Sequence, residues 1–396
     1  MKNQHSILKI LPVLFGFYIM GFGDVVGITT IHVKEDLLSD FSPDFHDTLS
    51  NLISVALFSM FLFFSVPTGM LMNKIGRKNT VLLSYAVTLV AMVIPLIAYT
   101  FTMILIAFAL LGIANTILQV AINPLLTNVV KGDKLTSTIT AGQFVKAISS
   151  FSGPFIAAYA ASALGNWQYM FPLYGIISLL SGIWLLATPI EENQAISKAS
   201  SFSGVFAILK DKTILVLFLG IVFVVGVDVG INTSAPKILM ERLGMSSIDA
   251  GYGTSMYFAF RTVGAFIGAF VLAKFTADKV FKVSIIGVVA ALLVLLFMHD
   301  KVGLFTLFAV IGFANSNIFS ILFSMAIQAR ADKVNEISGL MITAIFGGAV
   351  IPVIMGLLSD WIGSQTGSVL VILGCALYLL FCAFQPNRLK EEFEQR

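Results

Sequence analysis

The chain has 396 residues, of which 58% are hydrophobic and only 11% are charged. Soluble domains carry roughly 25% charged residues, so this chain lacks the polar side chains that would cover a water-soluble surface, and we expect an integral membrane protein. Its formal net charge of +3 gives no reason to expect a nucleic-acid partner. The two cysteines, Cys375 and Cys382, fall in the last apolar stretch and indicate neither a disulfide framework nor a metal site.

Twelve stretches are long and apolar enough to cross a bilayer, which takes about 20 mostly apolar residues. The alternating pattern of barrel strands does not occur, which favours helices. The predicted fold class is all-α integral membrane, with twelve transmembrane helices. In chain order the stretches are 7–30, 51–72, 80–99, 102–127, 138–162, 169–189, 213–234, 251–273, 283–298, 303–327, 338–358 and 367–384.

Lysine and arginine are distributed unevenly between the loops on the two sides. If both termini are cytoplasmic, 18 of the 24 basic residues fall in cytoplasmic segments, four fall outside and two lie within helices. Cytoplasmic loops of membrane proteins carry such an excess of positive charge. The distribution predicts a multi-pass protein with both termini in the cytoplasm, and it supports an even number of helices.

The longest cytoplasmic loop, 191–212, is polar and rich in serine. We interpret it as a linker between a six-helix bundle at 1–190 and a second six-helix bundle with a short cytoplasmic tail at 213–396. A sequence repeat supports this division, because GFGDVVGITT at 21–30 recurs in part as GVDVGINT at 226–233. The acidic outer loop 32–50 is expected to be a solvated connection.

The loop between the second and third stretches reads GMLMNKIGRK. It resembles the signature loop of the major facilitator superfamily, Gly-x-Leu-x-Asp-Arg/Lys-x-Gly-Arg-Arg/Lys, with asparagine in place of the acid. Its glycines permit a tight turn and close helix contact. Its basic residues can pair with acids of the neighbouring bundle and so latch one conformation, although an ordinary basic loop is the alternative. The predicted latch residues are Gly69, Asn73, Gly76, Arg77 and Lys78.

Other motifs resemble those of a narrower group, the fucose/glucose/galactose permeases. The segment ILQVAINP at 117–124 looks like this family's Leu-Gln/Glu-x-Ala-Ala-Asn-Pro, and FGGAVIP at 346–352 is the closest match. VGVDV at 225–229 and RTVG at 261–264 are similar to motifs of the seventh and eighth helices. The resemblance implies two pseudo-symmetric six-helix bundles and proton-coupled uptake of a monosaccharide.

Three positions depart from the family pattern. The acid that the family carries in its first helix falls nearer Ile28 than Asp24. A helix-four acid found in some members is Gln119, and Lys146 stands where a neutral amide is usual. These departures leave the class of protein unchanged but leave its substrate and coupling detail open.

A carboxylate inside a membrane-spanning helix is costly and therefore points to function. Asp24 is a candidate proton carrier, because burial favours its neutral form and a nearby cation favours its charged form. Lys146 belongs to the same half and is the candidate partner, unless it snorkels to the interface. Asp24 could instead be a structural acid. Its repeat, Asp228, is expected to contribute to coupling, to pair with Arg261 or to bind ligand.

The resemblance also implies that helices one, four, seven and ten line a central cavity. Amide groups donate and accept hydrogen bonds, which suits a polyhydroxyl ligand, and aromatic rings can stack on a sugar. The alternative for each residue is a hydrogen bond or packing contact between helices. The predicted substrate-binding residues are Gln119, Asn123, Gln143, Asn232, Asn315, Asn317, Tyr18, Phe144 and Tyr257.

The sequence thus predicts a secondary active transporter that works by alternating access in the bacterial cytoplasmic (inner) membrane. The expected activity is proton-coupled import of a hexose, a fucose-like sugar, or an amino or acidic sugar. The rivals are a proton antiporter that exports a drug or metabolite, and a sugar sensor that does not transport. We expect no enzyme activity, no cofactor and no metal, a proton (with sodium as the alternative) as coupling ion, a monomer, and only the substrate and the lipid bilayer as partners.

Overall fold

A computed structural model describes residues 2–38, 43–130, 134–192, 202–245 and 247–385. All elements within these ranges are helical, and ten helices among them are long and apolar enough to cross a membrane. The two other predicted spans are helical as well: the first is interrupted, and the ninth is α11 (Ala277–Leu295). The predicted all-α fold with twelve helical spans is confirmed.

The chain divides into two compact units. Unit 1 comprises Met1–Lys131, Gly142–Val205 and Lys333–Thr343, and unit 2 comprises Gly132–Ala141, Phe206–Asp332 and Ala344–Arg396. Each unit therefore includes a short segment from the other half of the sequence. The middle of the predicted linker, 193–201, and the predicted tail, 386–396, lie outside the described residues.

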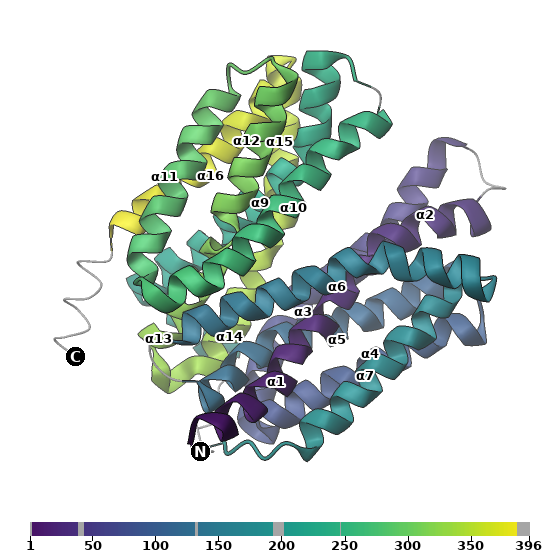
Figure 1. Ribbon diagram of the computed structural model, residues 1–396, viewed down its shortest axis with the longest axis vertical. Coiled ribbons are helices and arrows are strands. Elements are labelled where there is room, and N and C mark those ends of the chain that lie inside the picture. Colours follow the sequence, from purple (N-terminus) through teal and green to yellow (C-terminus); the bar gives the residue numbers. More distant parts are fainter. Residues whose placement is uncertain (1, 39–42, 131–133, 193–201, 246, 386–396) are drawn as a thin grey trace. The chain divides into compact units, whose positions relative to one another are not determined.

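Unit 1 is a bundle of helices: α1 (Lys2–Met20), η1 (Gly21–Val25), α2 (Val26–Leu37), α3 (Pro43–Ile75), α4 (Arg77–Ile97), α5 (Phe101–Val129), most of α6 (Lys134–Leu164), η2 (Trp167–Tyr169), α7 (Met170–Ala187) and α14 (Val334–Thr343). Its central helix is α5, which packs against α1, α3, α4 and α14 (Figure 1). Thr100 begins α5 by accepting a hydrogen bond from the Met103 amide, which satisfies one of the free donors of the first turn.

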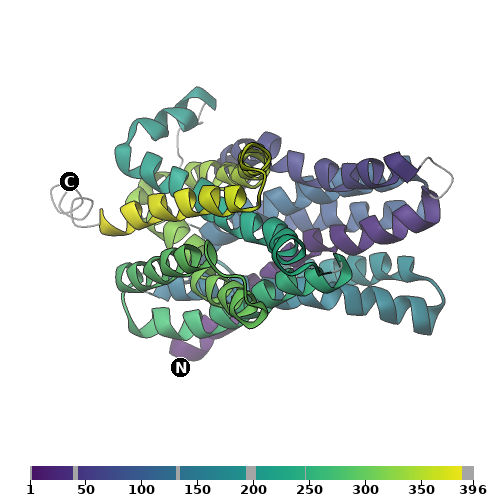
Figure 2. The same cartoon turned by 90° about the horizontal axis from the view of Figure 1, so that it is seen from above.

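Unit 2 contains η3 (Ile208–Lys210), α9 (Lys212–Leu243), α10 (Ser247–Lys274), α11, α12 (Lys301–Asn315), α13 (Ile318–Ala329), η4 (Ala331–Lys333), η5 (Ala344–Phe346), α15 (Gly347–Ile362) and α16 (Thr366–Phe384), while α8 (Phe202–Ala207) spans its border with unit 1. Its central helix is α9, which contacts α10, α12, α13, α15 and α16. Figure 2 shows the helices of this unit from above, coloured from teal to yellow along the chain. Asp211 caps the start of α9, and Gly244, with a φ of 63°, ends it in the left-handed conformation that favours glycine.

The two halves share a packing detail that supports the sequence repeat. Gly112 on α5 lies so close to the backbone carbonyl of Leu57 on α3 that a Cβ atom would not fit. Gly312 on α12 lies equally close to the carbonyl of Tyr257 on α10. Both residues of the second pair carry numbers 200 higher than those of the first. The repeat around the two aspartates therefore extends to the way in which helices pack within each half.

Three predicted spans are interrupted instead of continuous. The first, 7–30, is broken by the 3₁₀ turn η1, and the eleventh, 338–358, is broken by the 3₁₀ turn η5. The tenth, 303–327, is broken at Ser316 and Asn317, between α12 and α13. Hydropathy measures only how apolar a stretch is, so it does not reveal where the helical hydrogen-bond ladder changes. Such short 3₁₀ segments inside long helices often mark hinges.

Asp36, in the acidic outer loop that was expected to be solvated, is exposed and also makes contacts within the bundle. Its Oδ2 accepts hydrogen bonds from Tyr99 Oη and from Trp167 Nε1, each at 2.9 Å. His32 stacks on the Trp167 ring, with 4.6 Å between ring centroids. Burial, together with the bond to Asp36, raises the pKa of Tyr99 and keeps its phenol a donor. Asp36 therefore ties the end of α2 to two turns of the same bundle.

Candidate functional site

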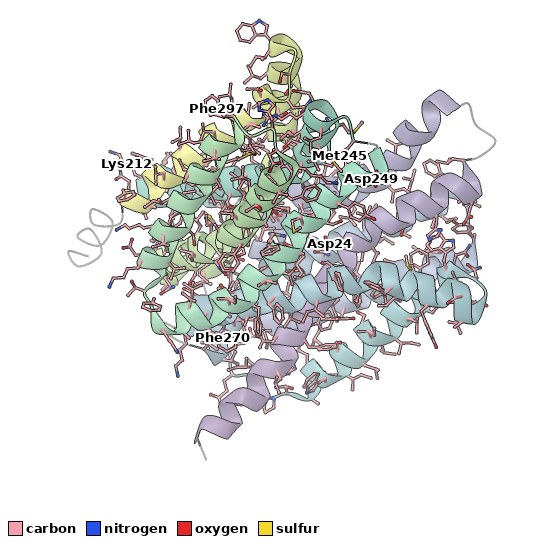
Figure 3. All side chains as sticks on the ribbon, turned by 45° about the horizontal axis from the view of Figure 1, so that its top comes forward. Asp24, Lys212, Met245, Asp249, Phe270 and Phe297 are labelled. Atoms are coloured by element: carbon pink, nitrogen blue, oxygen red, sulfur yellow. The ribbon has the colours of Figure 1, made fainter. Side chains whose placement is uncertain are left out.

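Asp24 lies in η1, where the first helical span is interrupted (Figure 3). The neighbouring Gly21 lets this turn approach α6 closely: a Cβ atom there would lie 2.5 Å from the Cβ of Ser149 and 2.9 Å from the carbonyl oxygen of Lys146. No side chain other than hydrogen fits that gap. The backbone that carries Asp24 is thereby held directly against α6.

The other side of the turn rests on α5. A Cβ atom on Gly23 would lie 2.5 Å from Nδ2 of Asn115. The Asn115 amide donates to the carbonyl oxygen of Met20 over 2.8 Å and accepts from Nε2 of Gln119 over 2.8 Å. The Asn115–Gln119 pair thus supplies a hydrogen-bond partner for the Met20 carbonyl at the helix break, where the regular backbone hydrogen bonds of the helix end. Gln119, predicted as a ligand contact, is buried and takes part in this support.

Lys146 lies beside Asp24, as the sequence suggested. Its Nζ is 3.8 Å from Asp24 Oδ2, and the two side chains are 26% and 39% exposed. Ser150 Oγ donates a hydrogen bond to the same carboxylate oxygen. Nearby, the Tyr18 hydroxyl is hydrogen-bonded to Ser152 Oγ at 3.3 Å. The ion pair is long and partly solvated, so it is weak enough to open.

A second acid–cation pair lies in unit 2. Arg261 Nε is 3.0 Å from Asp228 Oδ1, and Tyr257 donates to the same oxygen over 2.5 Å. Asn315 Nδ2 donates to the Tyr257 hydroxyl over 3.3 Å, and the Arg261 guanidinium lies 6.0 Å from the Phe258 ring centroid. Asp228 sits in the uninterrupted helix α9 and thus holds two close partners on a regular backbone. The structure adopts the pairing with Arg261 that the sequence left as one alternative.

Several predicted ligand amides are buried between helices. Asn123 donates to the carbonyl oxygen of Gln119 over 3.2 Å, within α5. Asn317 donates to the carbonyl oxygen of Gly264 over 3.2 Å and packs against Gly268, where α10 has no room for a side chain. These positions, together with the buried Asn315, favour helix packing over direct contact with a ligand.

Four other predicted ligand residues are half-buried, whereas Tyr257 is fully buried. Gln143 and Phe144 lie on α6, about one turn before Lys146, and Tyr18 lies on α1. Asn232 lies on α9 four residues after Asp228, and its backbone carbonyl accepts from Thr254 over 2.9 Å. Gln143, Lys146 and Ser150 are spaced three and four residues apart and share one face of α6. That face presents an amide, a cation and a hydroxyl together.

The signature loop is held by an acid from the far end of unit 1, just after α7. Gly76 has a φ of 86°, which favours glycine at the turn before α4. The Glu192 carboxylate accepts from the backbone amides of Arg77 and Lys78 at 2.7 and 2.6 Å. A carboxylate at the start of a helix also interacts favourably with the helix dipole. Lys78 Nζ donates to the carbonyl oxygen of Thr188 over 2.8 Å.

The Arg77 side chain joins three helices of unit 1. Its Nη1 donates to Oγ1 of Thr127 and Oδ1 of Asn128, at the end of α5, over 2.9 and 2.8 Å. Its Nε donates to Oδ1 of Asn335 on α14 over 2.8 Å. Arg77 therefore links α4 and α5 to a helix that the sequence places in the second half.

Asn73 provides the second link to α14. Its Nδ2 donates to Glu336 Oε1 over 2.7 Å, and its Oδ1 accepts from Asn335 over 2.6 Å. Gly69 and Gly339 allow α3 and α14 to meet closely. The carboxylate that the signature loop lacks is thus supplied from α14. The sequence predicted such a latch but identified neither Asn335 nor Glu336, which precede the predicted start of the eleventh span, nor Glu192.

Three comparisons agree with this architecture. The sequence profile described as "Major Facilitator Superfamily" matches residues 13–351. A glucose/galactose transporter of Brucella abortus is 25% identical over 400 residues, covering 96% of this chain and 94% of that protein. The Escherichia coli fucose:proton symporter matches with a TM-score of 0.82 at 16% identity, covering 96% of this chain and 98% of that chain. A proton:xylose symporter matches with a TM-score of 0.77 at 12% identity, covering 97% and 96%.

Proposed function

Because this chain belongs to the Major Facilitator Superfamily, we propose that it is a secondary transporter that imports a monosaccharide together with a proton by alternating access. The observation that carries the proposal is the partly solvated pair of Asp24 and Lys146 at a helix break. The name of the Brucella abortus relative supports a sugar as substrate. The names of the two solved structures support a proton as coupling ion, and the membership of a transporter superfamily argues against an enzyme.

Asp24 is the proposed proton carrier. While Asp24 is charged, it attracts Lys146 across 3.8 Å. When a proton binds, the carboxyl becomes neutral and the lysine loses its counter-ion, so Lys146 is free to turn toward a ligand hydroxyl. Both side chains are exposed enough for water to deliver and remove the proton. Protonation of Asp24 thus changes the local charge and also makes the Lys146 ammonium group available as a hydrogen-bond donor.

Asp228 is proposed to have a different task. Its two close partners, Arg261 and Tyr257, stabilise the charged carboxylate. Each unit pairs its intramembrane cation with a carboxylate, so the two clusters add no net charge. This balance favours a neutral monosaccharide over a sugar acid. The half-buried amides Gln143 and Asn232 would bind hydroxyl groups, and the rings of Tyr18 and Phe144 would stack on the sugar, with Tyr257 holding Asp228.

The proposed setting is the bacterial cytoplasmic membrane, with both termini in the cytoplasm. The excess of basic residues on one side supports this orientation. The protein is proposed to act as a monomer and to need no cofactor besides the coupling proton. On this orientation the signature loop and α14 lie at the cytoplasmic end, and their contacts are proposed to act as the conformational latch.

Uptake into proteoliposomes tests the proposal. Radiolabelled glucose, galactose and fucose are offered at an imposed inward proton gradient, and alkalinisation of the medium is recorded at the same time. We expect uphill accumulation of at least one sugar, with protons moving in the same direction. Protons moving against the sugar would instead indicate an antiporter. A matched sodium gradient without a proton gradient should give no accumulation.

The variant Asp24→Asn separates coupling from binding. It should lose accumulation against a gradient but retain counterflow, which exchanges labelled for unlabelled sugar without net proton movement. Accumulation that persists in Asp24→Asn would overturn the role of this residue. Loss of both activities with unchanged thermal stability would show that Asp24 is needed for substrate binding and not for coupling alone.

A further inference from the structure

Ser150 has two possible partners for one hydroxyl hydrogen. Its Oγ forms a hydrogen bond with Asp24 Oδ2, and it also lies 3.1 Å from the carbonyl oxygen of Lys146 on the preceding turn of α6. A serine hydroxyl donates one hydrogen bond and accepts others. It can therefore point its hydrogen at the carboxylate or at the carbonyl, but not at both at full strength.

We propose that Ser150 is a positioning residue that holds the Asp24 carboxyl in both of its protonation states. This inference rests on the proposed role of Asp24 in coupling. In the charged state the Ser150 hydroxyl donates to the carboxylate. After a proton binds, the Asp24 hydroxyl donates to Ser150 Oγ, and the serine hydrogen turns to the Lys146 carbonyl. One proton is gained by Asp24, and no covalent bond of Ser150 forms or breaks.

The surrounding backbone makes this exchange possible without a large movement. Gly21 brings η1 to within 2.9 Å of the Lys146 carbonyl oxygen, measured from the Cβ position of the glycine. Gly153 lies one turn after Ser150, and a Cβ atom there would lie 3.3 Å from Val25 Cγ1. The turn and α6 are thus in contact on both sides of Ser150. With the heavy atoms held, only a hydroxyl rotation is needed when Asp24 changes its charge.

The other polar groups that face Asp24 have different roles. Lys146 on α6 is the counter-ion, at 3.8 Å. Tyr18 on α1 is bonded to Ser152, and Tyr174 on α7 interacts with the carboxylate through its electrostatic field. Asn115 on α5 is engaged with the Met20 carbonyl. Within the described part of the chain, Ser150 is the side chain that donates a hydrogen bond to Asp24.

The inference predicts a shift in the pH at which Asp24 binds its proton. A hydrogen bond to a charged carboxylate is stronger than one to a neutral carboxyl, so removing the hydroxyl by Ser150→Ala disfavours the charged state. The titration midpoint should move to higher pH by about 0.5–1 unit. Ser150→Thr keeps the hydroxyl and should restore the midpoint. Ser150→Cys, with a weaker donor of similar volume, should give a smaller shift in the same direction.

The measurement is a pH titration of the protonated-carboxyl band by infrared difference spectroscopy, on the purified full-length protein in liposomes without sugar. The Asp24 band is identified by its disappearance in Asp24→Asn. Ser162→Ala is the matched control, because Ser162 lies at the exposed end of α6 and bonds only its own helix, at the carbonyl of Tyr159. Its midpoint should equal that of the parent protein.

The outcomes separate this inference from the proposed function. A midpoint in Ser150→Ala or Ser150→Cys equal to that of Ser162→Ala would overturn the role of Ser150. That result leaves Asp24 as proton carrier if Asp24→Asn still abolishes accumulation. If Asp24→Asn accumulates sugar normally, the coupling role fails whatever the spectroscopic midpoint. An alkaline shift that Ser150→Thr reverses supports the inference and excludes a purely steric effect.

Discussion

Replacing Asn73 with aspartate restores the acid of the superfamily's signature loop, yet we expect it to weaken the contact between α3 and α14. Asn73 Nδ2 donates to Glu336 Oε1 over 2.7 Å, and the substitution puts a second carboxylate in its place. Two unit charges about 4 Å apart repel by about 4 kcal/mol at an effective dielectric constant near 20. The lost hydrogen bond to a charged group is worth about 1.5–3 kcal/mol. These two effects sum to roughly 6 kcal/mol. The Arg77 cation interacts with Glu336, and we take it to offset about half of that sum. The net loss is then about 3 kcal/mol, or roughly 100-fold in equilibrium constant.

The equilibrium is measured through the reactivity of a buried thiol. Ser65 on α3 is fully buried, and Gly339 of α14 packs against its backbone carbonyl. A cysteine introduced by Ser65→Cys reacts with a water-soluble maleimide only when α14 separates from α3. Under conditions in which closing is faster than labelling, the rate follows the equilibrium population of the open state. Adding Asn73→Asp should raise that rate roughly 100-fold. The native Cys375 and Cys382 are buried and define the background.

A charge-exchange variant provides the control. Asn73→Asp combined with Glu336→Gln reverses donor and acceptor across the same contact, so labelling should return to within about fivefold of the parent rate, as expected when two residues in contact are changed together. Asp332→Asn, which changes a 59% exposed acid in unit 2, should have no effect. Unchanged labelling of Ser65→Cys in Asn73→Asp, or failure of the double variant to recover, would refute the pairing of Asn73 with Glu336.

Two other predictions concern coupling and packing. Lys146→Met keeps an unbranched side chain of similar length and removes the cation beside Asp24, so sugar uptake should lose its normal pH dependence. A pH profile equal to that of the parent protein would contradict the functional pairing of Asp24 with Lys146. Gly112→Ala and Gly312→Ala each force a methyl group onto a backbone carbonyl of the neighbouring helix, so each should cost about 1–3 kcal/mol of stability. Both should lower the thermal midpoint, whereas Gly251→Ala, with open space around the Cβ position, should not.

The twelve spans and the duplicated halves could be predicted because they depend on averages over many residues. Hydropathy over about 20 residues decides whether a stretch crosses a membrane. The repeat of Asp24 at Asp228 identified the duplication, and the matched glycine contacts in the two halves agree with it. An ion pair between Asp24 and Lys146 could also be predicted, because each charge is costly to bury alone.

The contacts of single residues could not be predicted in the same way. Ser150 lies in a run of small polar residues, and the sequence does not show which hydroxyl faces Asp24. In the sequence, Glu336 and Glu192 are ordinary acidic residues near helix ends. The contact of Glu336 forms only because α14 packs on α3, and the contacts of Glu192 form only because residue 192 lies next to the start of α4. Asn317 was expected to bind ligand, but its bond to a backbone carbonyl depends on a glycine in another helix.

The two repeated aspartates differ in the backbone conformation and in the polar partners around them. Asp24 sits in a 3₁₀ turn, has its cation at 3.8 Å and shares one serine hydroxyl with a carbonyl. Asp228 sits in a continuous helix, with Arg261 at 3.0 Å and Tyr257 at 2.5 Å. Under the proposed function we therefore expect the acid of the first half, in a 3₁₀ turn with a longer ion pair, to exchange protons, and the acid of the second half to hold α9 and α10 together.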